Sequence, residues 1–348
     1  MTATPALPGA DARLAELSTW AAATLRAPDL AIAPASADAS FRRYFRLSAG
    51  ADAPLAPGQR SLIAMDAPPE KEDSRPFVHV AALLRAAGVH APEVIKADLD
   101  RGFLLLTDLG QRTYLDELDA ASAPALYSDA IDALILWQRA SRDGELPPYD
   151  EPLLRRELDL FPDWYVAKHL GVALSPAQEQ VLAHAFRLVL DNNLAQPRVY
   201  VHRDYHSRNL MVSQPNPGVL DFQDAVHGPI TYDLVSLLRD AYVVWGEERQ
   251  IDWAARYWER ARRAGLPVTP DFAAFWRDFE WMGVQRQLKV LGIFARLAHR
   301  DGKTGYLADM PRVMAYLRGA CERYAALGPL LRLLDDLHDR RHGAGDTP

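Results

Sequence analysis

The hydrophobic period changes once along this chain, and that change limits the folds open to it. Up to about residue 110, short apolar and β-branched runs alternate with Pro, Gly and small-residue turns, which is typical of strands. Beyond it, apolar residues recur at helical spacing over long stretches, and only the segment 199–223 interrupts them with strand-like runs. We therefore predict an α+β protein with a small, β-rich N-terminal lobe and a larger, mostly helical C-terminal lobe.

The N-terminal lobe is predicted to hold about five antiparallel strands with helices over 11–26 and 73–87. The expected strands are LAIAPA, SFRRYFRLS, SLIAMDA and the two arms of a hairpin over 95–108. The helices expected in the C-terminal lobe are 123–141, 151–170, 175–194, 231–247, 270–300 and 306–337. The lobes meet near Thr107, Asp108 and Leu109, so we expect domains at 1–107 and 108–348.

Composition narrows the possible partners and cellular location. The one cysteine, Cys321, excludes an intramolecular disulfide framework and a structural zinc site made of cysteines. A net charge of −7 argues against nucleic-acid binding. No apolar run approaches the roughly 20 residues of a membrane helix, and the first residues lack the pattern of a signal peptide. We expect a cytoplasmic protein that does not bind membranes, acts on a small molecule and has no obligate protein partner.

Three polar side chains are predicted to converge after the strand-like run VYV. Asp204 and Asn209 lie on the loop of VYVHRDYHSRNLMVS, residues 199–213, and Asp221 follows in GVLDFQD. The apolar runs between them predict a hairpin that returns Asp221 beside the loop. An amide and a carboxylate suit a hard cation such as Mg²⁺, while the other carboxylate can accept a proton from a hydroxyl. That division of labour is what phosphoryl transfer from ATP requires.

A structural explanation exists for each of these residues taken singly, because Asp and Asn in loops most often cap helices or make turns. The combination of residue types at fixed spacing favours a kinase, since His-Arg-Asp, four residues, Asn and then Asp-Phe match the kinase pattern. For His202 we favour a structural role over a catalytic or metal-binding one: we expect a buried histidine that braces the loop.

HRDYHSRN followed by VLDFQDAVHGPITYDLVSLLRD resembles the aminoglycoside phosphotransferase and choline kinase-like family. The resemblance implies a bilobal protein-kinase-like fold that uses ATP and Mg²⁺. It also implies that Asp204 is the catalytic base, that Asn209 and Asp221 are the metal ligands, and that Asp233 is a structural acid at a helix start.

Together with SLIAMDAPPEKED, these motifs are most similar to the branch of the family that acts on amino sugars in cell-wall recycling. This implies an acceptor such as N-acetylmuramate or N-acetylglucosamine, phosphorylated at its anomeric hydroxyl. An aminoglycoside or a choline-like acceptor is the alternative within the family, and a nucleotide-binding pseudokinase is the alternative without catalysis.

The sequence departs from the kinase pattern in the N-terminal lobe. The usual lysine of the third strand is replaced by Ala64 or Met65, and SFRRYFRL lacks a Gly-rich loop. We expect Arg42, Arg43 or the backbone around Ser40 to contact phosphate instead, and the joint at 107–109 to border the nucleotide. Losing one charged hydrogen bond costs on the order of 1.5–3 kcal/mol, whereas losing the base or metal sites removes the mechanism, so an active enzyme is favoured.

Two other kinds of phosphate-binding protein fit poorly. A protein kinase would carry Lys where this chain has His206, and the only Ala-Pro-Glu, residues 91–93, precedes the loop. DGKTG at 301–305 lacks the first Gly of a P-loop and follows a helical pattern, so we predict a turn between helices.

The acceptor side is predicted from a basic stripe. Arg286, Lys289, Arg296 and Arg300 fall within an arc of about 80° at roughly 100° per residue. Such a stripe suits an acceptor with a carboxylate, although a plain solvated helix face is the alternative. We choose Arg286 from the stripe as a substrate contact, and add His206 and Asp224 because they lie close in sequence to the catalytic groups.

Overall fold

The computed structural model describes residues 11–37, 41–49, 55 and 59–343. Its N-terminal part is a five-stranded antiparallel sheet in the order β1-β2-β3-β5-β4. The strands are β1 (Ala31–Ala37), β2 (Arg43–Ser48), β3 (Ser61–Asp66), β4 (Val94–Asp98) and β5 (Phe103–Thr107). Every expected strand of this part is therefore present, and the prediction of an α+β fold is confirmed.

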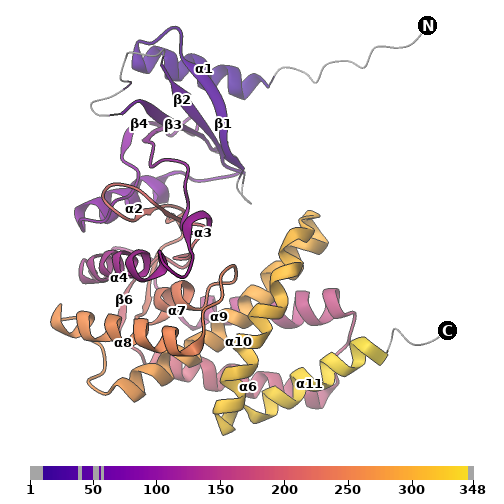
Figure 1. The fold of residues 1–348 in the computed structure, drawn as a ribbon. Helices are drawn as coiled ribbons and strands as arrows, with labels where there is room; N and C mark the ends of the chain where they lie inside the picture. Colours follow the sequence, from indigo (N-terminus) through magenta and orange to yellow (C-terminus); the bar gives the residue numbers. More distant parts are fainter. Residues whose placement is uncertain (1–10, 38–40, 50–54, 56–58, 344–348) are drawn as a thin grey trace, which may run out of the picture.

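Alternation along β2 gives the sheet two different faces. Phe45 and Leu47 point to one face, where they pack in a small core with Leu17 and Trp20 of helix α1 (Ala12–Leu25). Tyr44 and the residues in phase with it point to the opposite face, because successive side chains of a strand alternate. Helix α2 (Arg75–Ala86) packs on that face, between the sheet and the rest of the molecule (Figure 1).

A close backbone contact fixes the β4–β5 hairpin to the chain after β3. Gly102 has a φ of 73°, and a Cβ on it would lie 1.8 Å from the carbonyl oxygen of Ala67. The Ala67 N–H donates to the carbonyl oxygen of Gly102 at 2.9 Å. Only glycine fits both the backbone conformation and the contact.

The remainder of the chain is mostly helical and surrounds the long helix α9 (Phe272–Asp301). The other helices are α3 (Tyr114–Glu117), α4 (Ala123–Arg139), α5 (Glu151–Leu158), η1 (Phe161–Leu170), α6 (Pro176–Leu194), α7 (Tyr232–Leu238), α8 (Glu247–Arg263), η2 (Thr304–Asp309), α10 (Met310–Arg323), η3 (Ala325–Leu327) and α11 (Gly328–Gly343). Two small strand pairs lie among them: β6 (Arg198–Val201) with β9 (Val226–Pro229), and β7 (Leu210–Met211) with β8 (Gly218–Val219). Figure 1 shows this helical part below the sheet.

Several helix predictions need correction. The segment 306–337 is not one helix: it breaks into η2, α10, η3 and α11, and α10 and α11 each begin with Pro as their second residue. Proline is accommodated in a first helical turn but not in an interior, so a new helix begins there. The segment 151–170 likewise divides into α5 and η1. Helix α8 was not predicted at all.

The predicted helix over 231–247 ends early, at Leu238, for a tertiary reason. Asp240 leaves the helical path and accepts hydrogen bonds from the backbone N–H groups of Ser207 at 2.9 Å and Tyr242 at 2.8 Å. At the end of α9, Gly302 adopts a left-handed conformation with a φ of 68°. The turn predicted at DGKTG is thereby confirmed.

None of the helices built from the described residues is both long enough and apolar enough to cross a membrane.

Candidate active site

The loop after β6 is held by a buried carboxylate. Asp233, in the first turn of α7, accepts hydrogen bonds from the backbone N–H groups of His202 at 2.7 Å and Arg203 at 2.9 Å. Arg203 has a left-handed backbone with a φ of 79°, a conformation that residues other than glycine rarely adopt. Burial raises the pKa of the Asp233 carboxyl to about 7, against the lowering effect of these two hydrogen bonds.

His202 braces the same loop, as expected. The His202 side chain is buried, its Nδ1 accepts from the Asp204 N–H at 3.2 Å, and its Nε2 lies 2.9 Å from the carbonyl oxygen of Leu220. Burial lowers the pKa of His202 to about 4, so the ring is neutral near pH 7 and its Nε2–H donates to Leu220. This one ring joins the loop to the β7–β8 hairpin.

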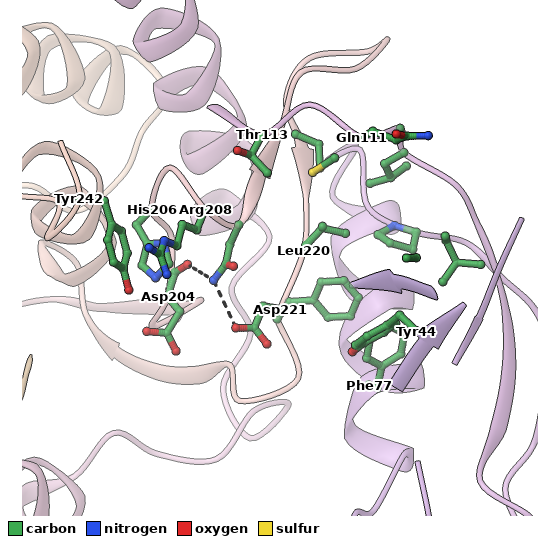
Figure 2. A pocket seen from close by; sticks show the side chains of 18 of the residues that line it. Tyr44, Phe77, Gln111, Thr113, Asp204, His206, Arg208, Leu220, Asp221 and Tyr242 are labelled. Carbon is green, nitrogen blue, oxygen red and sulfur yellow. Dashed lines mark hydrogen bonds between the residues drawn. The ribbon is translucent and has the colours of Figure 1, made fainter. Parts of the chain in front are cut away.

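The β7–β8 hairpin returns Asp221 to the loop (Figure 2). Leu210 pairs with Val219, and the Leu220 N–H donates to the Asn209 carbonyl oxygen at 2.9 Å. The Asn209 Nδ2 then donates to Asp221 Oδ2 at 3.2 Å and to the Asp204 carbonyl oxygen at 3.0 Å. Asp204, Asn209 and Asp221, which the sequence predicted to converge, lie together.

Asn209 and Asp221 are suitable ligands for Mg²⁺. The Asn209 Oδ1 takes part in none of the hydrogen bonds of the described residues, and the Asp221 carboxylate lies within reach of the same amide. In the described part of the chain, no group of three or more His, Cys, Asp or Glu side chains could hold a metal. A site with few protein ligands is what Mg²⁺ uses when substrate phosphates complete its shell.

A buried ion network lies under the loop. Glu157 of α5 accepts a hydrogen bond from Tyr149 OH, pairs with Arg203 Nη2 at 2.5 Å and with Lys289 Nζ at 3.2 Å. Burial raises the pKa of Glu157, but Lys289 and Arg203 outweigh it and hold that pKa below its ordinary value. The carboxylate stays charged, and it fixes one side chain of the loop and one of α9.

The electrostatics of Asp204 follow from this arrangement. Burial raises the pKa of Asp204, but the positive charges of Lys289, of His206 when protonated, of Arg203 and of Arg286 lower it to about 2. Asp204 is therefore an ionised hydrogen-bond acceptor at neutral pH. Such a group can orient a hydroxyl and take its proton in a transition state.

A cavity of about 660 Å³ opens between the sheet and the helical part, and Asp204 lines it. The predicted site residues that line the cavity are Thr107, Asp108, Leu109, Asp204, His206, Asn209, Asp221 and Arg286. They come from the joint after β5, from the loop, from the hairpin and from α9. Residues from separate parts of the chain thus share one cavity of a size suited to small ligands.

Two predicted residues, Arg43 and Asp224, are not among the residues that line this cavity. Arg43 lies on the α1 face of β2, where it pairs with Asp66 at 2.5 Å, so it is not one of the residues that line the cavity. Asp224 is exposed in the turn that follows the hairpin and also does not line it. Ser40 lies outside the described residues. Arg42, the alternative to Arg43, pairs with Glu72 at 2.9 Å and is also not among the residues that line the cavity.

The basic stripe divides along α9. Arg286 and Lys289 are buried and line the cavity, whereas Arg300 is exposed beside Asp301. The alternative of a solvated face is thus wrong for the first two residues. On β3, Ala64 packs toward α1 and Met65 toward α2, and both are buried. Lys289 is the one lysine among the lining residues that the structure describes.

The sequence interpretation missed several residues that line the cavity. Tyr44 and Arg46 lie on the inner face of β2, and strand alternation in SFRRYFRL would have shown that they share a face. Arg46 Nε lies 2.6 Å from Asp108 Oδ2. The guanidinium of Arg208 lies 3.8 Å from the ring centroid of Tyr242 and 5.4 Å from that of Tyr306. Arg208 carried no such signal, because both rings are distant from it in sequence.

A model described as the phosphotransferase enzyme family matches residues 31–276. The chain belongs to this family. Among its relatives, a protein of Pseudomonas aeruginosa named N-acetylmuramate/N-acetylglucosamine kinase is 52% identical over 94% of this chain and 97% of its own. A protein of the same name from Neisseria meningitidis serogroup B is 49% identical over 93% of this chain and 96% of its own.

Solved structures of other phosphotransferases share the fold of this family member. Choline kinase LicA from Streptococcus pneumoniae aligns with a TM-score of 0.60 at 12% identity, over 88% of this chain and 100% of its own. The ADP-bound aminoglycoside phosphotransferase APH(2'')-Ib aligns with a TM-score of 0.55 at 14% identity, over 87% of this chain and 97% of its own. The bilobal kinase-like architecture predicted from the sequence is confirmed.

Proposed function

We propose that this phosphotransferase moves the γ-phosphoryl group of ATP to the anomeric hydroxyl of N-acetylmuramate, N-acetylglucosamine or both. The observation that carries the proposal is the meeting of Asp204, Asn209 and Asp221 in a cavity lined from both the sheet and the helical part. The names of the relatives that are about half identical over almost the whole chain support the acceptor.

The nucleotide is proposed to bind between a lobe of residues 1–107 and a lobe of residues 108–348. The adenine would lie against the joint at Thr107, Asp108 and Leu109, which lines the cavity. The Leu109 N–H is used by none of the hydrogen bonds within the described chain, so it is available to a purine nitrogen. The inner face of β2, with Tyr44 and Arg46, would cover the nucleotide from the sheet.

The phosphates are proposed to point toward Asn209 and Asp221. Bound there, Mg²⁺ would neutralise phosphate charge and favour the departure of ADP. The departure from the kinase pattern on β3 leaves no lysine on the sheet side of the cavity among the described residues. Arg46 of the sheet lines the cavity but is paired with Asp108, so charge for the phosphoryl group would come chiefly from the metal and from the helical lobe.

Asp204 is proposed to act on the acceptor. Its carboxylate accepts the proton of the C1 hydroxyl while the hydroxyl oxygen forms a bond to the γ-phosphorus and the bond from phosphorus to the β-phosphate oxygen breaks. The products are the sugar 1-phosphate and ADP. His206 and Arg286, which line the cavity beside Asp204, are proposed to contact the sugar.

The proposal is tested with purified protein and Mg-ATP against N-acetylmuramate, N-acetylglucosamine, kanamycin and choline, with ADP release as the readout. We expect release with the acetylated sugars. Asp204→Asn should fold, bind ATP and lose turnover by roughly two to four orders of magnitude, because the amide cannot accept the proton. Asp132→Asn, at an exposed carboxylate of α4, serves as the control and should keep normal turnover.

ADP release with kanamycin or choline but with neither sugar would show that the acceptor is an aminoglycoside or a choline-like molecule instead. Nucleotide binding without release for any acceptor would favour the pseudokinase. Near-normal turnover of Asp204→Asn would remove Asp204 from the role of base.

A further inference from the structure

Arg286 is a buried cation with unused hydrogen-bonding capacity. Its side chain is 3% exposed, and its Nε donates to Ser236 Oγ at 2.6 Å. The Nη1 is buried and has no hydrogen-bond partner within the described chain, and none of the ion pairs found there includes Arg286. A buried guanidinium with an unpaired donor and no ion pair is costly, so the Nη1 end of Arg286 suits an anionic group that the described chain does not supply.

Lys289, one turn further along α9, lines the same cavity but already has polar partners. Its Nζ lies 3.2 Å from Glu157 Oε1 and donates to Tyr232 OH at 2.9 Å. Burial lowers the pKa of Lys289, but Glu157 outweighs it and raises that pKa above its ordinary value. The two cations of α9 thus differ: Lys289 already has a carboxylate, whereas Arg286 does not.

The neighbours of Arg286 place its unused end on the acceptor side. Burial has the largest effect on the pKa values of Asp204, His206 and Tyr242, but the charge of Arg286 also acts on all three, so they lie within its field. Figure 2 shows these three residues on one side of Asp221, with Tyr44 of the sheet on the other. Ser236, which anchors Arg286, belongs to α7 of the helical lobe. An anion at Arg286 would therefore lie on the Asp204 side of Asp221, away from Tyr44 of the sheet.

We propose that Arg286 binds a carboxylate on the acceptor, and that it gives the enzyme a preference for N-acetylmuramate over the neutral N-acetylglucosamine. This inference rests on the proposed function. Arg presents a planar pair of donors that matches a carboxylate, and N-acetylmuramate carries one on its lactyl substituent. Ile293 and Phe294, which follow on α9 and line the cavity, would meet the apolar parts of the same sugar.

The test compares kcat/KM for the two sugars in the unaltered enzyme, in Arg286→Gln and in Arg300→Gln. Arg300 lies on the same helix, is exposed and, among the residues that the structure describes, pairs with Asp301, so its substitution should leave both values unchanged. Arg286→Gln should lose roughly ten- to a hundred-fold more on N-acetylmuramate than on N-acetylglucosamine, as expected for loss of a charge-assisted hydrogen bond.

A second comparison needs no variant and therefore does not depend on whether Arg286→Gln folds. Conversion of the lactyl carboxylate of N-acetylmuramate to its carboxamide should lower kcat/KM of the unaltered enzyme by a similar factor. If Arg286→Gln folds, a further arm is open: the same conversion should change little in that variant, because the partner of the carboxylate is then missing.

The outcomes separate this inference from the proposed function. Inactivity of the unaltered enzyme on both sugars would overturn both. Activity with equal losses on the two sugars in Arg286→Gln, together with a raised KM for ATP, would assign Arg286 to phosphate and overturn the inference alone. Unaltered activity on the carboxamide would also overturn it.

Discussion

Three cations surround Asp204, and they come from different parts of the chain. Arg203 precedes it on the loop, while Arg286 and Lys289 reach it from α9. Burial raises the pKa of Asp204, and the charge of Lys289 is the largest of the effects that lower it to about 2. The ionisation of the proposed base is thus set mainly by a residue that is distant in sequence.

Lys289→Met should raise the pKa of Asp204, because the largest of the effects that offset burial would be removed. The folded-state pKa of the unaltered enzyme lies below the ordinary value, so protonation of Asp204 does not limit kcat/KM until strongly acid pH. In the variant, the acid limb of the kcat/KM profile should move upward by about 1 pH unit or more. Profiles between pH 2 and 8 check this, and Arg300→Gln serves as the control. An unmoved acid limb would show that Lys289 does not set this pKa.

The sequence was sufficient to predict that Asp204, Asn209 and Asp221 converge, because their spacing and the short hairpin between them are local properties. It was insufficient for Arg43 and Asp224. Arg43 lies one position out of phase with the inner face of β2, and Asp224 points to solvent only three residues after Asp221. Proximity in sequence does not specify direction, and a change of one residue along a strand exchanges the faces of the sheet.

At the scale of elements, α9 carries both cavity cations and must be held at a defined depth. It crosses the segment before η1 closely: a Cβ on Gly292 would lie 2.4 Å from the carbonyl oxygen of Leu160. The nearest atoms of Leu160 are backbone atoms, so a Cβ on Gly292 could be accommodated only if one of the two elements moved. The glycine lets the two elements approach and thereby positions Arg286 and Lys289.

Gly292→Ala should destabilise the protein by about 1–3 kcal/mol, as overpacking does in a tight core. Gly319→Ala is the matched control, since Gly319 lies inside α10 and a Cβ there would meet nothing within 4 Å. That variant should be neutral or more stable by about 0.5–1 kcal/mol. Thermal unfolding of both variants provides the measurement. Equal stability of the two would mean that α9 is not confined by this crossing.

The elements were predictable to different degrees. Strands of the sheet could be placed because short alternating runs are bounded by turns. The missed α8 carries its signal in the sequence, since Trp253, Ala254, Tyr257 and Ala261 form one buried helical face. The early end of α7 could not be predicted, because it depends on a hydrogen bond that Asp240 accepts from the Ser207 N–H, in a loop more than thirty residues earlier in the chain.

At the scale of the whole molecule, the cavity exists only because the sheet and the helical part are held together at the joint. Arg46 of β2 links them: its Nε and Nη2 contact Asp108 at 2.6 and 3.1 Å, and its Nη2 donates to the Gly110 carbonyl oxygen at 2.8 Å. Asp108 also accepts from Ser61 Oγ at 2.7 Å. The joint is therefore an ordered contact, and no local sequence pattern specifies it.

The central claim is that this cavity directs the phosphoryl group to the anomeric oxygen. It is tested most directly by the ³¹P NMR spectrum, with proton coupling, of the sugar product made from N-acetylmuramate and Mg-ATP. We predict a single phosphomonoester whose phosphorus couples to the C1 proton, together with loss of the reducing end. A phosphorus coupled to the C6 protons, with the reducing end intact, would contradict the account.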